Sequence, residues 1–256
     1  MNNMRVNLVA IAKNEDPYIE EWIEYNLKIG FDFIFLYLND WEYTPTSDRV
    51  KAFQFNGHGV HLECYREFLR KHHKECEWAA FFDIDEFLVL KKHNNVKDFI
   101  SDVDNRFNTK QIGINWAYFG DNGISDFPEG TEGVLERFTM RGKEGSLTVK
   151  SIVNVVEVSN NLPMIDSFVN THYLYYDSIT PSGGLVHGVY SIDPDLEIAQ
   201  LNHYYCKTKK EFEIKIARGR SDLHTSNPGY YGNMDSFYDC NLNEVEDLMA
   251  LNFFKS

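Results

Sequence analysis

Two aspartates separated by one isoleucine, Asp83 and Asp85, are the side chains in this sequence whose types and spacing best suit chemistry. They interrupt an apolar segment, with Phe81-Phe82 before them and Phe87-Leu88 after them. Burying carboxylates without partners would be very costly, and a divalent cation would remove that cost, since oxygen ligands suit Mn²⁺ or Mg²⁺. One acid could hold a metal bound to a diphosphate while the other contacts metal or ribose. The alternative is a turn whose acids cap a following helix, and the tripeptide alone leaves both interpretations open.

The elements before the two acids predict an α/β arrangement that places them at the end of a strand. Three short apolar runs are typical of buried strands: 5–11, 31–38 and 78–82. Between the first two, Asp16 is a suitable N-cap, Pro17 suits the first helical position, and Gly30 can end the helix in the left-handed conformation. Strand, helix and strand in this order imply a parallel pair joined by a right-handed crossover.

The rest of the chain predicts one continuous α/β domain in two parts. A short strand at 59–62 and helices at 63–74 and 95–103 complete a nucleotide-binding half at residues 1–105. Residues 106–256 are richer in strand formers and turns, and we expect a mixed β extension followed by helices. The elements predicted there are strands at 111–118, 133–138, 147–158, 168–176 and 196–205, loops at 120–131, 139–146 and 177–190, a helix opened by the capping box Thr208-x-x-Glu211 and ending near Gly219, and a last helix opened by Asn243-x-x-Glu246.

Polar residues follow each of the strands predicted to be parallel. Ligands of such sheets bind at the carboxyl ends of the strands, so these turns are the places where a binding site is expected. The residues concerned are Lys13-Asn14, Asn39-Asp40, and the acids Asp83 and Asp85.

A second chemical signal is the segment 207–220, which holds six of the 25 lysines and arginines of an otherwise acidic chain. A helix N-terminus beside Lys207 could bind a diphosphate through its free N–H groups and its dipole. Lys207 and Arg218 could then stabilise a departing nucleotide diphosphate. The alternative is a solvated helix face, and we favour that interpretation for Lys209 and Lys210.

Composition argues against several classes of protein. The chain has 39 acidic and 25 basic residues, and its net charge of −14 argues against nucleic-acid binding and against flat adsorption to anionic lipid. No apolar run reaches the ~20 residues that span a bilayer, and the N-terminus does not read as a signal peptide. The four cysteines lack the spacing of a zinc site, so we expect reduced thiols. These features predict a cytoplasmic protein with at most peripheral contact to the inner membrane face.

Residues spread along the chain match the pattern of one family: Ala10–Glu15 with Tyr18, Glu21-Trp22, Trp78, Phe82-Asp-Ile-Asp-Glu-Phe87, Asn115-Trp116, Phe119-Gly120, Lys150, Asn202-His203-Tyr204, Lys207 and Arg218-Gly219. Through these residues, the stretch 6–222 resembles glycosyltransferases of the GT-A fold, in the group that includes family 92 and its bacterial family-2-like relatives. The resemblance implies a single Rossmann-like domain with an acceptor-side extension, which transfers a hexose from a UDP-sugar. UDP-galactose and UDP-glucose both fit as donors, and the implied acceptor is a saccharide or lipid-linked saccharide of surface polysaccharide synthesis.

The resemblance also implies roles for individual residues. The D-x-D acids, Asp83 and Asp85, would bind Mn²⁺ (or Mg²⁺) and the donor's diphosphate, and His203 would complete the metal shell. For His203 the alternative is a hydrogen-bonded histidine among tyrosines. In this fold the turns after the first strands hold the base and ribose, with Asn39 or Asp40 on the uracil edge. The implied nucleotide-sugar contacts are Ala10, Lys13, Asn14, Asn39, Asp40, Arg66, Asp83, Ile84, Trp116 and Arg218.

An inverting transfer also needs a carboxylate that takes the proton of the acceptor hydroxyl. The candidates are Asp121, Glu211 and Asp222. Relatives often carry a small hydroxyl residue near Asp121, so the chain departs from the family pattern there. The rings of Trp116, Tyr118 and Phe119 either stack on sugar or belong to the core. His172 and His187 either line the acceptor side or are structural.

Two other functions use some of the same residues. A metal-dependent nucleotide phosphohydrolase would use the acids and the basic helix, but it should carry further metal ligands near Asp83. A non-catalytic module for carbohydrate or nucleotide would keep the aromatic residues without needing Asp83, Asp85 and His203 together.

Overall fold

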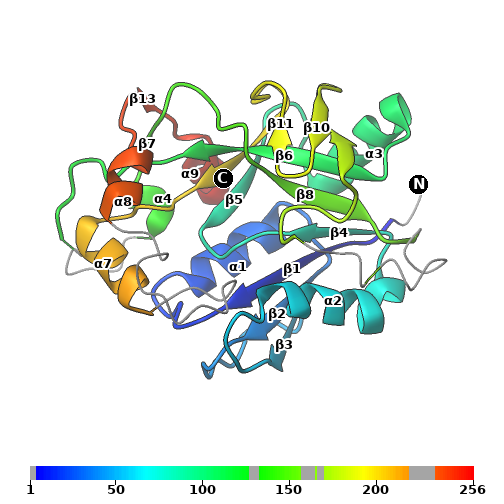
Figure 1. The fold of residues 1–256 in the computed structure, drawn as a ribbon, viewed down its shortest axis with the longest axis horizontal. Helices are drawn as coiled ribbons and strands as arrows, with labels where there is room; N and C mark the ends of the chain where they lie inside the picture. The colour runs from blue at the N-terminus through cyan, green and yellow to red at the C-terminus, as the bar shows by residue number, and fades with distance from the viewer. Residues whose placement is uncertain (1–3, 127–132, 157–164, 166–169, 219–233) are drawn as a thin grey trace.

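The computed structural model describes residues 4–126, 133–156, 165, 170–218 and 234–256, and these form a mixed α/β fold around one large sheet (Figure 1). In chain order the elements are β1 (Val6–Ala12), α1 (Ile19–Lys28), β2 (Phe33–Leu38), β3 (Val50–Gln54), α2 (His61–His72), the 3-10 turn η1 (His73–Glu75), β4 (Trp78–Phe81), β5 (Glu86–Leu90), α3 (Val96–Phe107), β6 (Gln111–Tyr118), α4 (Val134–Arg137), β7 (Met140–Arg141), β8 (Val149–Asn154), β9 (Asp177–Ile179), β10 (Leu185–His187), β11 (Tyr190–Ser191), β12 (Ala199–His203), α7 (Lys209–Arg218), α8 (Met234–Cys240), β13 (Val245–Glu246) and α9 (Met249–Lys255).

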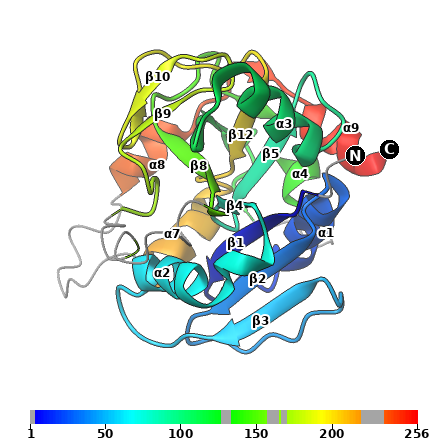
Figure 2. The same cartoon turned by 90° about the vertical axis from the view of Figure 1, so that its right-hand side faces the viewer.

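The first part of the chain forms a parallel sheet in the strand order β4-β1-β2-β3. Helices α1 and α2 cover opposite faces of it (Figure 2). Alternation along β1 explains this arrangement, because successive side chains of a strand point to opposite faces. Leu8 and Ala10 belong to the core that includes Trp22 of α1, whereas Val9 and Ile11 belong to the core that includes Phe68 of α2. The predicted parallel pair and the predicted α/β class are confirmed.

The second part of the chain continues the same sheet. Strand β8 lies between β4 and β6 and is antiparallel to both. Strand β12 runs parallel to β6 and antiparallel to β5, the strand that follows the two acids. Its register places His203 opposite Glu86, and the Tyr204 N–H donates to the Asp85 carbonyl at 2.9 Å. His203, which lies 118 positions after Asp85 in the sequence, is thereby fixed beside Asp85.

Several local predictions are confirmed. Strand β6 has the predicted bounds 111–118, and Gly30 has φ +108°, as expected for a residue that ends α1. The capping box is formed, because Thr208 N–H donates to the Glu211 carboxylate and Glu211 N–H donates to Thr208 Oγ1.

Other local predictions are wrong. Asp16 does not cap α1, which begins at Ile19; its carboxylate accepts a bond from the Trp41 ring nitrogen. Residues 59–62 lead into α2, and the strand of this region is β3. Residues 133–138 contain the short helix α4 rather than a strand, because the Glu21 carboxylate of α1 accepts bonds from the N–H groups of Val134 and Leu135 at its N-terminus.

The later loops and the last helix also differ from expectation. The stretch 177–190 holds β9, β10 and the start of β11, and the stretch 139–146 holds β7. Asn243 does not open a helix, since Val245–Glu246 pair with β7 and α9 begins at Met249. Residues 168–169 of the predicted strand 168–176 lie outside the described ranges. None of the helices in those ranges is long and apolar enough to cross a bilayer.

Candidate active site

A cavity of about 410 Å³ opens at the carboxyl ends of β1 and β4, where the sequence predicted a binding site. Its wall combines carboxylates with cations and aromatic rings, a mixture that suits a charged ligand carrying a sugar or base. The acids are Glu15, Asp83, Asp85 and Asp239, the cations are Lys13, Lys215 and Arg218, and the rings include His61, His172, His203, Trp116, Tyr118 and Tyr205.

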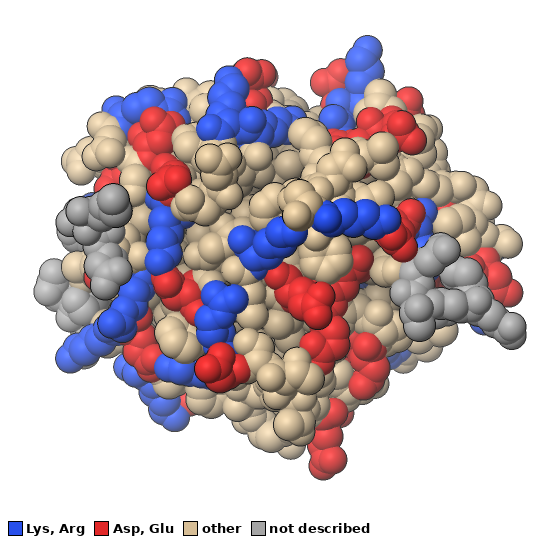
Figure 3. All heavy atoms as spheres, turned by 180° about the vertical axis from the view of Figure 1, so that it is seen from behind, with Lys and Arg blue, Asp and Glu red and all other residues tan. Residues whose placement is uncertain are grey.

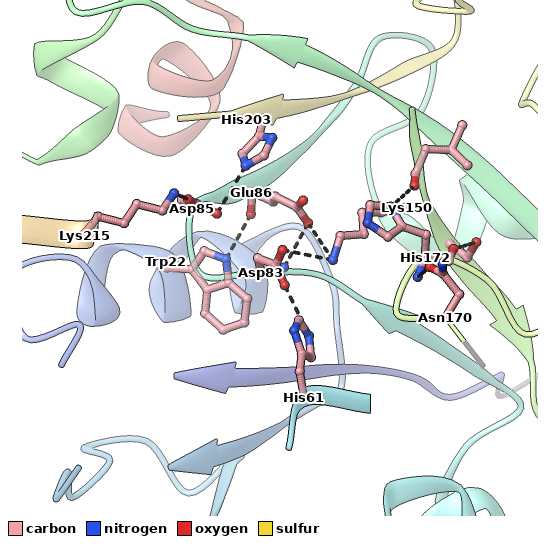
Figure 4. Close-up of polar contacts among 12 residues, drawn as sticks. Trp22, His61, Asp83, Asp85, Glu86, Lys150, Asn170, His172, His203 and Lys215 are labelled. Atoms are coloured by element: carbon pink, nitrogen blue, oxygen red, sulfur yellow. Dashed lines mark hydrogen bonds and ion pairs between the residues drawn. The ribbon is translucent and has the colours of Figure 1, made fainter. Parts of the chain in front are cut away.

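Asp83 is held by two partners from different elements (Figure 4). Lys150 Nζ of β8 lies 3.0 Å from its Oδ2, and His61 Nε2 of α2 lies 3.5 Å from its Oδ1. Burial alone would raise the pKa of Asp83, but the ammonium of Lys150 and then His61 outweigh burial and lower that pKa to about 2. Its backbone N–H donates to Glu86 Oε2 at 2.9 Å, which also fixes the turn.

Asp85 points the other way, toward Lys215 and His203 (Figure 4). Lys215 Nζ of α7 lies 2.7 Å from Oδ2, and His203 Nε2 of β12 lies 3.5 Å from Oδ1. Burial opposes ionisation of Asp85, yet Lys215 and His203 lower the pKa of its carboxyl well below the usual value. Burial lowers the pKa of His203, against the attraction of Asp85, so the neutral imidazole is favoured.

Asp85 and His203 offer two donor atoms that face each other across 3.5 Å. Two ligands about 2.1 Å from one octahedral ion lie about 3–3.5 Å apart, so this pair fits Mn²⁺ or Mg²⁺. Asp83 does not join them: in the described part of the chain, no three His, Cys, Asp or Glu residues are grouped to hold a metal ion. The predicted trio of ligands is therefore not assembled. A site with two protein donors is completed by substrate phosphates and water, as is usual for Mg²⁺.

Arg218, at the end of α7, joins that helix to the turn after β1. Its guanidinium donates to the Lys13 carbonyl at 2.6 Å and to Glu15 Oε1 at 2.6 Å. Burial raises the pKa of Glu15, and Arg218 partly offsets the effect. Lys13 Nζ in turn lies 3.5 Å from Asp40 Oδ2, so the turns after β1 and β2 meet as predicted.

A second cavity of about 320 Å³ adjoins the first, and the two share Glu15, Tyr205, Lys215 and Arg218. Lys207 lines only this second cavity, with φ +50° and 6% exposure, and its Nζ lies 4.4 Å from the centre of the Tyr18 ring. Burial lowers the pKa of Lys207, and Asp85 is the strongest of the charges that oppose this. Asn14 also lines the second cavity.

The other predicted nucleotide contacts are divided between the cavity and the scaffold. Ile84 and Trp116 line the main cavity. Ala10 is buried in the core of the sheet. Asn39 is buried and donates to the carbonyls of Phe55 and Gly57, and Arg66 pairs with Glu63; neither lines the main cavity.

Of the three acids predicted as catalytic bases, Asp121 and Glu211 do not line the main cavity. Asp121 lies in the turn after β6, where its carboxylate accepts bonds from Gly123 N–H and the Asn243 side chain. Glu211 is bound by both terminal nitrogens of Arg137 at 2.9 Å and by the Tyr18 hydroxyl at 2.7 Å. Burial would raise the pKa of Glu211, but Arg137 and the hydrogen bonds lower it to about 2. Asp222 lies outside the described residues.

Sequence reasoning did not assign roles to Glu15, Lys150, Lys215 or Asp239. A local signal existed for Lys215, because Glu211, Lys215 and Arg218 follow at helical spacing on one side of α7. Lys150 carries no local signal, since it is one buried cation in an apolar strand and its partner lies 67 residues earlier in the sequence.

Comparison with known proteins agrees with the resemblance noted from the sequence. The pattern of glycosyltransferase family 92 matches residues 41–228. A glycosyltransferase family 92 protein of Ricinus communis is 23% identical over 221 residues, covering 82% of this chain and 37% of its own length. One of Arabidopsis thaliana is 23% identical over 146 residues, covering 50% of this chain and 25% of its own length. The chain thus spans well under half of these relatives.

Among solved structures, the crystal structure of A197 from STIV aligns with 72% of this chain and with 94% of the A197 chain. The sequence identity is 10% and the TM-score is 0.32, which is too low to indicate a shared fold. The family pattern, in contrast, covers well over half of the chain, including Asp83, Asp85, Lys150 and His203. The chain belongs to glycosyltransferase family 92.

Proposed function

We propose that the protein is a GT-A glycosyltransferase that moves a hexose from a UDP-sugar to a saccharide acceptor, with inversion at the sugar carbon. The observation that supports this best is the pairing of charges in the main cavity. Asp85 and His203 offer metal donors, and Lys215 and Arg218 lie in the same wall. A metal-bound diphosphate carries a cation that Asp85 and His203 can bind and anionic oxygens that Lys215 and Arg218 can bind.

Mn²⁺ or Mg²⁺ would be held by Asp85 and His203, and when bound it supplies positive charge that stabilises the leaving diphosphate. Asp83, fixed by Lys150 and His61, would accept hydrogen bonds from the ribose or from metal-bound water. Lys13, with Asp40 beside it and Asn14 in the adjoining cavity, would form the nucleotide side, and Ile84 its apolar floor. Asn39, Arg66 and Ala10 would support these turns from outside the main cavity.

The remaining contacts concern the leaving group and the sugars. Lys207 and Arg218 would stabilise the charge that develops on the diphosphate. Trp116 would stack on the donor sugar, with galactose and glucose as the two candidate hexoses. The acceptor would be a saccharide, free or lipid-linked, of a surface polysaccharide. The protein would work in the cytoplasm or at the inner face of the membrane.

The test is the free energy of unfolding in the presence of UDP, with Mn²⁺ and with EDTA. At 100-fold excess over the dissociation constant, UDP with Mn²⁺ should add about 2.7 kcal/mol. Asp85→Asn should remove most of that stabilisation, while Glu197→Gln, at an exposed acid outside the main cavity, should retain it. Release of UDP from UDP-galactose and UDP-glucose then identifies the donor.

Two outcomes would contradict the proposal. Equal stabilisation by UDP in EDTA and in Mn²⁺ would rule out the metal. The absence of any UDP effect on the parent protein under all conditions would rule out the nucleotide-sugar site itself.

A further inference from the structure

We propose that Asp239, on α8, is the catalytic base that takes the proton of the attacking hydroxyl. This inference rests on the proposed transferase function and adds a residue that the sequence motifs do not indicate. Transfer with inversion needs a carboxylate near the acceptor oxygen, and such a group contributes about 10²- to 10⁴-fold to the rate.

The acids of the main cavity differ in whether a cation holds them. Four carboxylates line it, and three of them are bound by cations: Glu15 by Arg218, Asp83 by Lys150, and Asp85 by Lys215. The ion pairs lower the pKa values of Asp83 and Asp85, which makes both carboxylates poor proton acceptors. Burial raises the pKa of Glu15, but its carboxylate is held by the Arg218 guanidinium, which also donates to the Lys13 carbonyl. Within the described ranges, the Asp239 carboxylate is found in no hydrogen bond or ion pair, so it is the acid of this wall that no cation holds.

Helix α8 presents Asp239 to the main cavity. Ser236, Asp239 and Cys240 are spaced i, i+3 and i+4, and all three line the main cavity, so one side of α8 faces it. Phe237 is buried between them, and its ring lies 5.4 Å from that of Phe212 on α7. Helices α7 and α8 are neighbours at one end of the molecule (Figure 1). Asp239 is therefore carried by an anchored helix and not by a free loop.

Aromatic rings line the cavity beside the metal donor His203. Tyr118 stacks on His203 at 5.3 Å between ring centres, and Tyr205 packs against both His203 and Phe212. All of these residues line the same cavity as Asp239. A donor sugar over His203 and Trp116 would thus leave space toward α8 for an acceptor sugar, whose hydroxyl would lie between the donor carbon and Asp239.

The transfer involves the acceptor hydroxyl, the anomeric carbon, the diphosphate oxygen and the Asp239 carboxylate. The acceptor oxygen bonds to the anomeric carbon while its proton passes to the Asp239 carboxylate. The bond from that carbon to the diphosphate oxygen breaks, and its electron pair leaves with UDP. Asp239 is exposed, so the proton can then be released to water.

The experiment compares Asp239→Asn with Asp235→Asn, the same substitution at an acid of α8 that does not line the main cavity. UDP release from UDP-galactose and UDP-glucose is measured with water and with a panel of methyl glycosides as nucleophiles. Asp239→Asn should lower the rate by about 10²-fold or more, while Asp235→Asn should change it less than about threefold. UDP with Mn²⁺ should stabilise both variants as it stabilises the parent.

Chemical rescue separates a base from a positioning residue. In Asp239→Ala, sodium formate should restore part of the lost rate, because a small carboxylate can occupy the vacated space and accept the proton. Formate should not affect Asp235→Ala.

Three results would overturn the inference. Asp239→Asn could transfer as fast as the parent while still binding UDP. It could lose UDP stabilisation together with activity, which would make the residue part of the donor site. If the parent protein neither bound UDP nor cleaved UDP-sugars, both the proposed function and the role of Asp239 would be wrong. If Asp239→Asn were fully active and still bound UDP, only the role of Asp239 would be wrong.

Discussion

Single residues determine how firmly the two acids of the D-x-D motif are held. The side chain of Lys150, the partner of Asp83, is 1% exposed, whereas that of Lys215, the partner of Asp85, is 26% exposed. If Asp83 released Lys150, the buried ammonium would be left without a partner and without water, which is costly. If Asp85 released Lys215, water could solvate that partly exposed ammonium. We therefore expect Asp83 to keep its partner and Asp85 to exchange Lys215 for the metal and diphosphate.

Lys207 provides the first prediction at this scale. Its ammonium is buried beside Tyr18, and among the surrounding charges Asp85 acts on it most strongly, so it should act on charge that develops during transfer. Lys207→Ala should lower kcat by about 10²-fold, the effect of losing one electrostatic donor. Lys209→Ala and Lys210→Ala, both exposed, are the controls and should each change kcat less than about threefold. Equally small effects of all three substitutions on kcat, measured by steady-state kinetics at saturating Mn²⁺, would refute a role of Lys207 in stabilising the leaving diphosphate.

His172 provides the second prediction. Burial lowers the pKa of His172 from 6.5 to about 4, and its Nδ1–H donates to the Val149 carbonyl. Between these two pKa values the unfolded chain binds a proton that the folded chain does not, so folding stability falls as the pH decreases below about 6.5. The contribution between pH 7 and pH 5 is about 2 kcal/mol.

Replacement of the titrating ring should remove that contribution. His172→Asn keeps an amide N–H for the Val149 carbonyl but cannot titrate. Between pH 7 and pH 5, the free energy of unfolding of the parent should therefore fall by about 2 kcal/mol more than that of the variant. Urea unfolding at both pH values measures the difference. The same pH dependence in both proteins would show that the imidazole is protonated in the folded state.

At the scale of elements, helix α7 has its N-terminus fixed by one buried carboxylate. Glu211 completes the capping box with Thr208 and also accepts two bonds from Arg137 of α4. The start of α7 is thus tied to α4, while its last turn carries Lys215 and Arg218 to the main cavity. The capping motif is a local feature, but its position relative to the site depends on Arg137.

Two substitutions distinguish the local cap from the tertiary pair. Thr208→Ala should lower the free energy of unfolding by about 1 kcal/mol, as for loss of a cap. Glu211→Ala should lower it by about 3–5 kcal/mol, because it also removes one partner of a buried ion pair. Lys209→Ala should be within about 0.5 kcal/mol of the parent. Equal losses for Thr208→Ala and Glu211→Ala in denaturant unfolding would show that Arg137 contributes nothing.

At the scale of the whole molecule, one sheet runs through both parts of the chain. Strands β4 and β6 are joined through β8, and β5 is joined to β6 through β12. Basic and acidic side chains are interspersed on the face shown in Figure 3, although the net charge is −14. That distribution agrees with a chain whose cations pair locally and does not resemble a broad basic surface for nucleic acid.

The continuous sheet predicts a single unfolding transition. Trp22, Trp41 and Trp78 report on the first part of the chain and Trp116 on the second. Fluorescence and far-UV circular dichroism should give the same midpoint in guanidinium chloride, and UDP with Mn²⁺ should shift both equally, because neither part can lose its strands alone. Two separated transitions would instead indicate that residues 1–105 and 106–256 unfold independently.

Local sequence patterns determined much of this protein. Apolar runs fixed β1, β2, β4 and β6 within a few residues, and the polar residues after them identified the edge of the sheet where the cavity opens. The capping box fixed the start of α7. These features depend on neighbours one to four positions apart, and such neighbours are readable in the sequence.

Contacts between distant segments decided the rest. Residues 133–138 form a helix because Glu21 of α1 binds their N–H groups, and Asn243 binds the N–H of Asn122 instead of opening a helix. Asp83 and Asp85 look alike in the sequence, yet β8 gives Lys150 to the first, and α7 and β12 give Lys215 and His203 to the second. Strand order and register bring these groups together, and no pattern of adjacent residues encodes them.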